Sequence, residues 1–281
     1  MRISICFWLV VVVVALASLP ALAADAVITL PPLDRGFQLL YGLQFDRAND
    51  VFKAWQQSHP EDPMGPACEA AGLLFSEFHR LGVLESQFYE DDQKFNDRAT
   101  VTPDPAVRDR FQAAVQKSED IAHVKLAKNA KDLDALFALT MTSGLQADYA
   151  ALIDKKNLAS LRYTKEANNW AAQTLAVDPH CYDAYVASGF SKYIIGSMNA
   201  PMRWLVRLGG ISGDKAEGIK ELQLTAEHGR YLAPFANILL AMAYVREHDK
   251  TKARERLESL RNEFPANPLF AREIARLDSG H

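Results

Sequence analysis

Histidine and carboxylate side chains are the first candidates for chemistry in this sequence, because together they bind metals and move protons. Glu119 and His123 are four residues apart, which places both on one face of a helix. One such pair is a far weaker signal than the His-Glu-x-x-His or paired Cys-x-x-Cys spacings of metal sites. We therefore predict a solvated helical pair, with no metal site, no cofactor and no catalytic residue.

Cysteine is the other reactive side chain, and Cys68 and Cys181 lie outside the N-terminal apolar run that holds Cys6. Cys181 lies at an expected helix start, where the helix N-terminus can lower the pKa of a thiol. No second cysteine is near it, and Tyr182 and Tyr185 indicate a packed face. We expect Cys68 and Cys181 to be buried thiols that act as small apolar residues, although export would permit a disulfide.

Signatures of hydrolases and nucleotide-binding proteins are absent from the sequence. It has no Gly-x-Ser-x-Gly turn, no phosphate-binding loop ahead of Lys-Ser/Thr and no dinucleotide fingerprint. The glycine-rich run 209–215 follows no strand pattern, which favours a flexible connection into the next helix. The net charge is −4 and the basic residues are spread along the chain, so the sequence predicts no nucleic-acid partner.

The first 23 residues have the pattern of a secretory signal peptide. Arg2 precedes an apolar run from Ile5 to Ala17, and 21–23 supplies the small-x-small pattern of a cleavage site. The run is shorter than the roughly 18 residues of a membrane-spanning helix. We predict cleavage after Ala23 and a periplasmic or secreted product, with a retained N-terminal anchor as the alternative.

After a short lead-in over residues 24–32, the sequence from 33 to 281 is helical in pattern. Ala48, Phe52 and Trp55 belong to one apolar stripe with a period near 3.6 residues. Four Asx-Pro dipeptides predict helix starts, because the Asx side chain accepts a backbone N–H and proline suits the first helical position. Many short helices in series are therefore expected. The dipeptides are Asp62-Pro63, Asp104-Pro105, Asp178-Pro179 and Asn267-Pro268.

Three stretches of the chain share one spacing. A small residue is followed by an apolar residue four positions later and by a proline twelve positions later. The small residue suits the closest crossing of two antiparallel helices, the later apolar residue fills the groove toward the next unit, and proline ends the second helix. In the first and third stretch another small residue lies twelve positions earlier. The residues are Gly36, Ala48, Phe52 and Pro60, then Ala167, Ala171 and Pro179, then Ala241, Ala253, Leu257 and Pro265.

This pattern resembles the tetratricopeptide repeat (TPR), a helix–turn–helix unit of about 34 residues. The match is best over 33–60 and 235–265, and the irregular layout is similar to that of certain secreted bacterial TPR proteins. The resemblance implies an all-α fold, an α-solenoid or superhelix of about five antiparallel helix pairs. Apolar and charged residues alternate from Leu269 to Leu277, which predicts a final helix that caps the array. The spacing of the prolines leaves room for two insertions, at 80–103 and 196–213.

In this repeat class the first helix of each pair lines the concave surface, so the resemblance implies a partner-binding groove. The expected lining is apolar and aromatic, without the Lys, Asn and Arg side chains of TPR domains that clamp a peptide carboxylate. Either the groove binds an apolar segment of a partner, or the two insertions fold back and fill it. The candidate groove residues are Phe37, Leu40, Tyr41, Phe137, Met141, Phe190, Tyr193 and Met242.

The stretch 201–208 is short, amphipathic and weakly basic, and offers Met202 and Trp204 as candidate contacts to a partner. A membrane surface is the weaker alternative, and a short helix packed on the array is the plainest interpretation. The sequence thus favours an exported scaffold that binds a protein partner, with cell-envelope assembly as one candidate role. An enzyme or small-ligand-binding protein, with its site enclosed in the groove, is the alternative.

Overall fold

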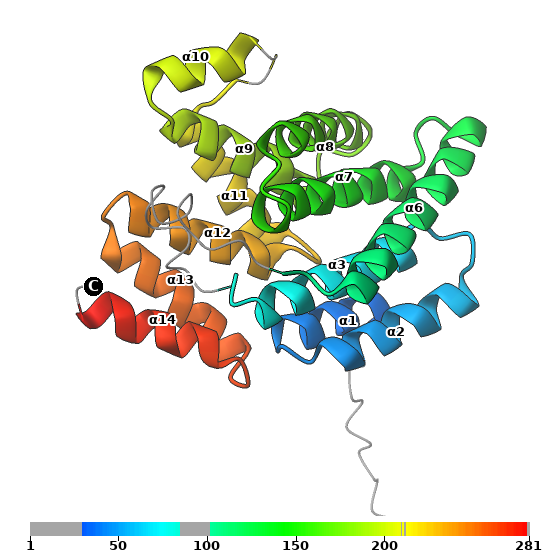
Figure 1. Ribbon diagram of the computed structural model, residues 1–281, viewed down its shortest axis with the longest axis horizontal. Coiled ribbons are helices and arrows are strands. Elements are labelled where there is room, and N and C mark those ends of the chain that lie inside the picture. Colours follow the sequence, from blue (N-terminus) through cyan, green and yellow to red (C-terminus); the bar gives the residue numbers. More distant parts are fainter. Residues whose placement is uncertain (1–29, 85–101, 209, 211, 280–281) are drawn as a thin grey trace, which may run out of the picture. The chain divides into compact units, whose positions relative to one another are not determined.

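The computed structural model describes residues 30–84, 102–208, 210 and 212–279 (Figure 1). They belong to a compact unit from Pro31 to His281, apart from Leu30, which ends a separate N-terminal unit. All regular elements of the described residues are helices, which confirms the predicted all-α class. The predicted signal peptide, most of the lead-in and residues 85–101 of the first insertion lie outside the described residues.

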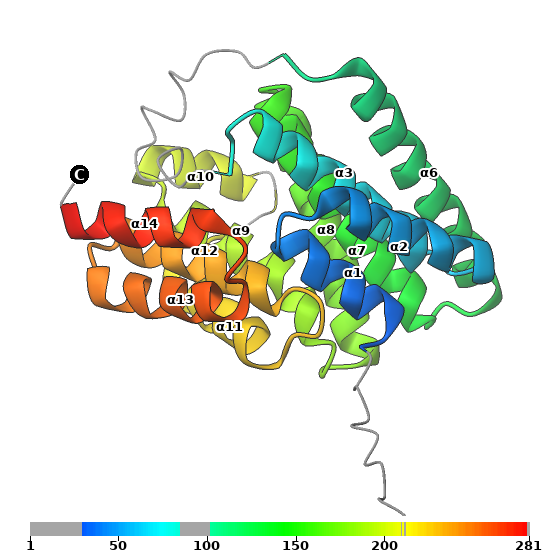
Figure 2. The same cartoon turned by 90° about the horizontal axis from the view of Figure 1, so that it is seen from below.

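The described helices form five antiparallel pairs in chain order, followed by α14 (Pro268–Ser279), which confirms the predicted series (Figure 1, Figure 2). Each pair also contacts the next pair along the chain, as in an α-solenoid. The pairs are α1 (Pro32–Tyr41) with α2 (Phe45–Ser58), α3 (Met64–Arg80) with α6 (Pro105–Lys128), α7 (Leu133–Asp148) with α8 (Asn157–Val177), α9 (Tyr185–Ser197) with α11 (Lys215–His228), and α12 (Ala233–Arg246) with α13 (Lys250–Glu263).

Three shorter elements lie between these helices. A π-helix, Tyr149–Ile153, continues α7, and a 3-10 helix, Tyr182–Ala184, precedes α9. The second predicted insertion contains α10 (Ala200–Leu208), between α9 and α11. Among the helices of the described ranges, none combines the length and apolarity that crossing a membrane requires.

Small residues lie where the paired helices approach most closely, as the repeat pattern predicts. Ala48 and Ala253 are fully buried. A Cβ added to Gly36 on α1 would overlap the ring of Phe52 on α2. α9 and α11 also approach closely at Gly218, where a Cβ would lie 2.6 Å from the backbone oxygen of Gly189. Larger side chains at these crossings would force the helix axes apart.

Three of the four predicted helix starts are confirmed. The side chains of Asp62, Asp104 and Asn267 each accept a backbone N–H from the residue two positions later, at 2.9, 2.8 and 2.9 Å. The prediction for Asp178 is wrong, because its carboxylate accepts the N–H of His180 in a turn and α9 begins only at Tyr185.

Contacts also join repeats that are far apart in sequence. The hydroxyl of Tyr41, at the end of α1, donates to the backbone oxygen of Tyr231 at 3.0 Å. The amide of Asn267 donates to the backbone oxygen of Tyr41 at 2.9 Å. Arg230 donates two hydrogen bonds to Asp34, at 2.9 and 2.8 Å. The first helix pair therefore contacts both the α11–α12 connection and the α13–α14 connection.

Candidate functional site

The predicted groove lining packs mainly against the chain itself. The ring of Tyr231 lies 5.1 Å from that of Phe37 and 6.5 Å from that of Phe137, stacked on both. The ring of Phe264 lies 5.5 Å from that of Tyr41. Binding of a partner here stays a prediction, and it requires these side chains to become accessible. Phe37, Leu40, Tyr41, Phe137, Met141 and Tyr193 are buried, and Phe190 and Met242 are half-buried.

Tyr231 was not among the predicted residues, and its position depends on a carboxylate that no motif marks. Asp183 is buried and accepts backbone N–H groups from Arg230, Tyr231 and Leu232, at 3.0, 3.2 and 2.8 Å. These bonds hold the α11–α12 connection that carries Tyr231. The signal in the sequence is a single Asp, whose partners lie 47 to 49 residues away.

α10 presents one large aromatic side chain to solvent. Trp204 is 62% exposed, and Arg203 and Arg207 on the same helix are exposed as well. On the other side of the helix, Val206 is buried in a small apolar cluster with Ile195. The side chain of Met202, the other predicted contact on this helix, lies outside the described part of the structure. α10 is therefore a packed short helix with an exposed tryptophan and two exposed arginines.

A polar pocket of about 170 Å³ lies between α8, α9 and the residues that follow α10. Its lining side chains are ammonium, amide and hydroxyl groups. The lining residues are Lys165, Asn168, Asn169, Ser188, Ser191, Lys192, Gly210 and Ser212.

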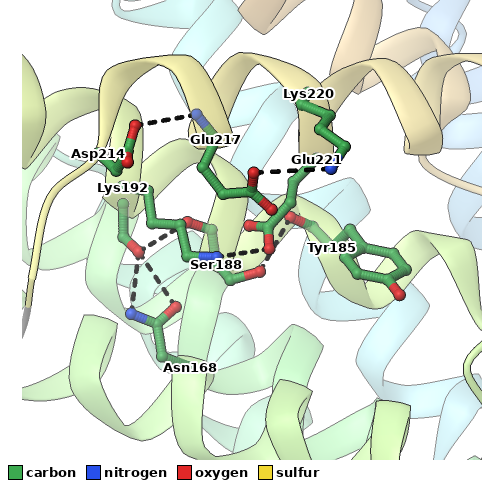
Figure 3. Close-up of polar contacts among 9 residues, drawn as sticks. Asn168, Tyr185, Ser188, Lys192, Asp214, Glu217, Lys220 and Glu221 are labelled. Atoms are coloured by element: carbon green, nitrogen blue, oxygen red, sulfur yellow. Dashed lines mark hydrogen bonds and ion pairs between the residues drawn. The ribbon is translucent and has the colours of Figure 1, made fainter.

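A hydrogen-bond network holds the walls of the polar pocket in place (Figure 3). Lys192 donates to Glu221 of α11 at 2.5 Å, and Glu221 is only 7% exposed. Asn168 and Ser191 are joined by two hydrogen bonds, at 2.9 and 3.2 Å. The second carboxylate oxygen of Glu221 is buried and finds no hydrogen-bond partner among the described residues. Removing the Lys192 charge would therefore leave a buried carboxylate uncompensated.

Glu119 and His123 lie close enough on α6 for the charge of His123 to act on the Glu119 carboxyl group, but the two described side chains form no hydrogen bond or ion pair with each other. His123 is exposed and its ring meets that of Trp170 edge-on at 6.3 Å. Glu119 is half-buried and accepts a hydrogen bond from Gln146 at 2.6 Å, and burial raises the pKa of its carboxyl group. Within the described ranges, no cluster of three or more His, Cys, Asp or Glu residues could hold a metal ion.

Cys68 and Cys181 are free thiols that lack the setting of a nucleophile. Cys68 is fully buried, and desolvation raises the pKa of its thiol. Cys181 is half-buried and precedes a 3-10 helix, so the predicted place in the first turn of an α-helix is wrong. Desolvation raises the pKa of Cys181 to about 12, so its thiol stays protonated at neutral pH.

No protein-family model matches the chain, and no curated protein matches it. One solved structure that is similar to it is a thermophilic TPR protein of Thermus thermophilus. That protein is 15% identical in sequence, the alignment covers 88% of this chain and 96% of that chain, and the TM-score is 0.44. The helix pairs of the chain and the contacts between them establish its all-α fold independently of this similarity.

Proposed function

We propose that this chain is an exported scaffold that binds another protein through the exposed face of α10. The observation that carries the proposal is the exposure of Trp204, on a helix that is fixed to the array by Val206. Tryptophan and arginine are the residues most enriched at the energetic centres of interfaces. A chain of packed helix pairs offers a rigid support for such a contact, because each pair is held by its neighbours.

The charge of this surface indicates the chemistry of the partner. Arg203 and Arg207 flank Trp204, and residues 194–213 contain no Asp or Glu. A partner surface with an apolar pocket for the indole ring and an acidic rim would complement both features. Such a rim would also speed association, in a way that added salt would weaken.

Capture from an envelope extract tests this proposal when the capture depends on Trp204. We expect wild-type protein to retain a partner that Trp204→Ala loses. Leu158→Ala is the matched control, because Leu158 is 86% exposed on α8 and is also truncated to alanine. A hot-spot residue contributes about 2 kcal/mol or more, which is roughly a thirtyfold loss of affinity. The proposal fails if wild type and Trp204→Ala retain the same proteins, or if neither retains any.

Export rests on the N-terminal pattern and has its own test. We propose that residues 1–23 are removed and that the remaining chain is periplasmic or secreted. Mass spectrometry of protein recovered from the periplasm or medium should give a chain that begins at Ala24. Recovery of the uncleaved chain in the membrane fraction would support the retained anchor instead.

A further inference from the structure

The exposed face of α10 does not account for the polar pocket beside this helix. The walls of the pocket come from α8, α9 and the connection that follows α10. Gly210, in that connection, has a φ of +87°, a backbone conformation that favours glycine. A Cβ there would lie 3.2 Å from the ammonium nitrogen of Lys165, so a larger residue would narrow the pocket at this point.

The ammonium groups of the polar pocket are already engaged by the chain. Lys192 is paired with Glu221 of α11 at 2.5 Å, and Lys165 has an interaction of its own. No carboxylate is among the described lining residues. The pocket therefore offers neither an uncommitted cation that would attract an anion nor a carboxylate that would attract a cation. Its charges favour a neutral polar ligand.

The neutral side chains of the polar pocket can both donate and accept hydrogen bonds. Asn168 uses one amide N–H and one lone pair of its carbonyl oxygen in two bonds with Ser191, at 2.9 and 3.2 Å (Figure 3). Its second N–H and second lone pair stay available to a ligand. The hydroxyl of Ser188 makes only a long bond of 3.4 Å, to the backbone oxygen of Tyr185, so a better-placed acceptor can replace it.

Asn169 and Ser212 add an amide from α8 and a hydroxyl from the connection after α10. Both residues are exposed, and within the described part of the chain neither side chain has a hydrogen-bond partner. The hydroxyl groups of a ligand also donate and accept at the same atom, whereas an ionised oxyanion only accepts and an ammonium group only donates. The pocket thus matches several neutral hydroxyl groups better than it matches an ion.

We infer that the polar pocket binds a neutral sugar or another small polyol. Its volume of about 170 Å³ is close to the ~150 Å³ of an engineered cavity that holds benzene, so a six-membered ring is of the right size. The amides and hydroxyls of the lining come from three separate parts of the chain, so they can bind the hydroxyl groups of one ring from several directions. This site does not depend on the protein partner proposed for Trp204.

Titration of the folded chain with glucose, N-acetylglucosamine and inorganic phosphate, followed by calorimetry, tests the site. We expect at least one of the two sugars to bind with millimolar affinity, and phosphate to bind about tenfold more weakly or not at all. Asn169→Ala and Ser188→Ala should each weaken sugar binding about three- to tenfold, because each removes a hydrogen bond to the ligand. Alanine is the best helix former and the Lys192–Glu221 pair stays intact, so both variants should fold.

Asn157→Ala is the matched control, because Asn157 is an exposed asparagine of the same helix, α8, and lies outside the lining. This variant should bind the sugar as wild type does. The inference is overturned if wild type binds neither sugar at roughly 50 mM, where even an affinity of about 10 mM would show. It is equally overturned if phosphate binds as tightly as the better sugar, or if Asn169→Ala and Ser188→Ala both bind that sugar as Asn157→Ala does.

Discussion

Asp148 is a half-buried carboxylate at the end of α7. It shares one face of the chain with the buried residues Met141, Leu145 and Leu152, at offsets of −7, −3 and +4. No described residue makes a hydrogen bond or ion pair with its side chain. Desolvation raises the pKa of Asp148 to about 7, from an ordinary value of 3.8. Asp148 is therefore a local source of instability whenever it is ionised.

The contribution of Asp148 to stability should fall as the pH rises from about 4 to about 7, because the folded chain holds the Asp148 proton that the unfolded chain has released. Asp148→Asn replaces the titrating carboxyl group with an amide that stays neutral at both pH values. We expect the variant to be more stable than wild type by about 1–3 kcal/mol at pH 8 and nearly equal to it at pH 4. Urea unfolding at the two pH values measures the difference, and a variant that gains nothing at pH 8 would contradict it.

The crossing of α1 and α2 gives a second prediction at this scale. Gly36→Ala would drive a methyl group into the ring of Phe52, so we expect a loss of about 1–3 kcal/mol in the free energy of unfolding. Gly144→Ala is the matched control, because Gly144 lies inside α7 with no atom within 4 Å of an added Cβ. That variant should gain about 0.5–1 kcal/mol from helix propensity. Equal effects of the two substitutions, measured by urea denaturation, would contradict the close crossing.

At the scale of the elements, the sequence predicts the contacts that recur at a fixed spacing within a helix pair. The pairs α1–α2 and α12–α13 could be predicted because small residues, apolar plugs and prolines recur at fixed spacing within each pair. Tyr231 and Asp183 could not, because neither the stacking of Tyr231 on Phe37 nor its bond to Asp183 follows a spacing that recurs in the sequence. The polar pocket was missed for the same reason, since its lysines belong to different helices and only the fold brings them together.

Asp183 allows a test of how the α11–α12 connection is held. Asp183→Ala would leave three backbone N–H groups of the α11–α12 connection without the buried carboxylate that accepts them. We expect a loss of about 2–4 kcal/mol in the free energy of unfolding, and faster hydrogen exchange of residues 230–232. Asp178→Ala is the control, because Asp178 accepts only one backbone N–H, in an exposed turn nearby. Equal protection of residues 230–232 in wild type and Asp183→Ala would contradict the role of this carboxylate.

At the scale of the whole molecule, the hydrogen bond between Asn267 and Tyr41 joins residues 226 positions apart. In an open array each repeat contacts only its neighbours, so a substitution in the last repeat has little effect on the stability of the first repeat. Here the connection between α13 and α14 bonds directly to α1 of the first pair. The helix pairs from α1 to α14 should therefore unfold together rather than one at a time.

Asn267→Ser tests this coupling, because serine keeps an acceptor for the N-cap of α14 but cannot supply the amide that reaches Tyr41. In a Trp170→Phe, Trp204→Phe background of the chain from Ala24 on, Trp55 on α2 reports the first pair by its fluorescence. We expect Asn267→Ser to lower the stability reported by Trp55 by about 1–2 kcal/mol, and helix content by circular dichroism to follow the same curve. Asp249→Ala, which removes the cap of α13 and the ion pair between Asp249 and Lys252, is the control for a change confined to the C-terminal helices. If the array were open, the Trp55 transition would stay where it is in wild type while circular dichroism showed early loss of the C-terminal helices, because nothing would connect Asn267 to α2.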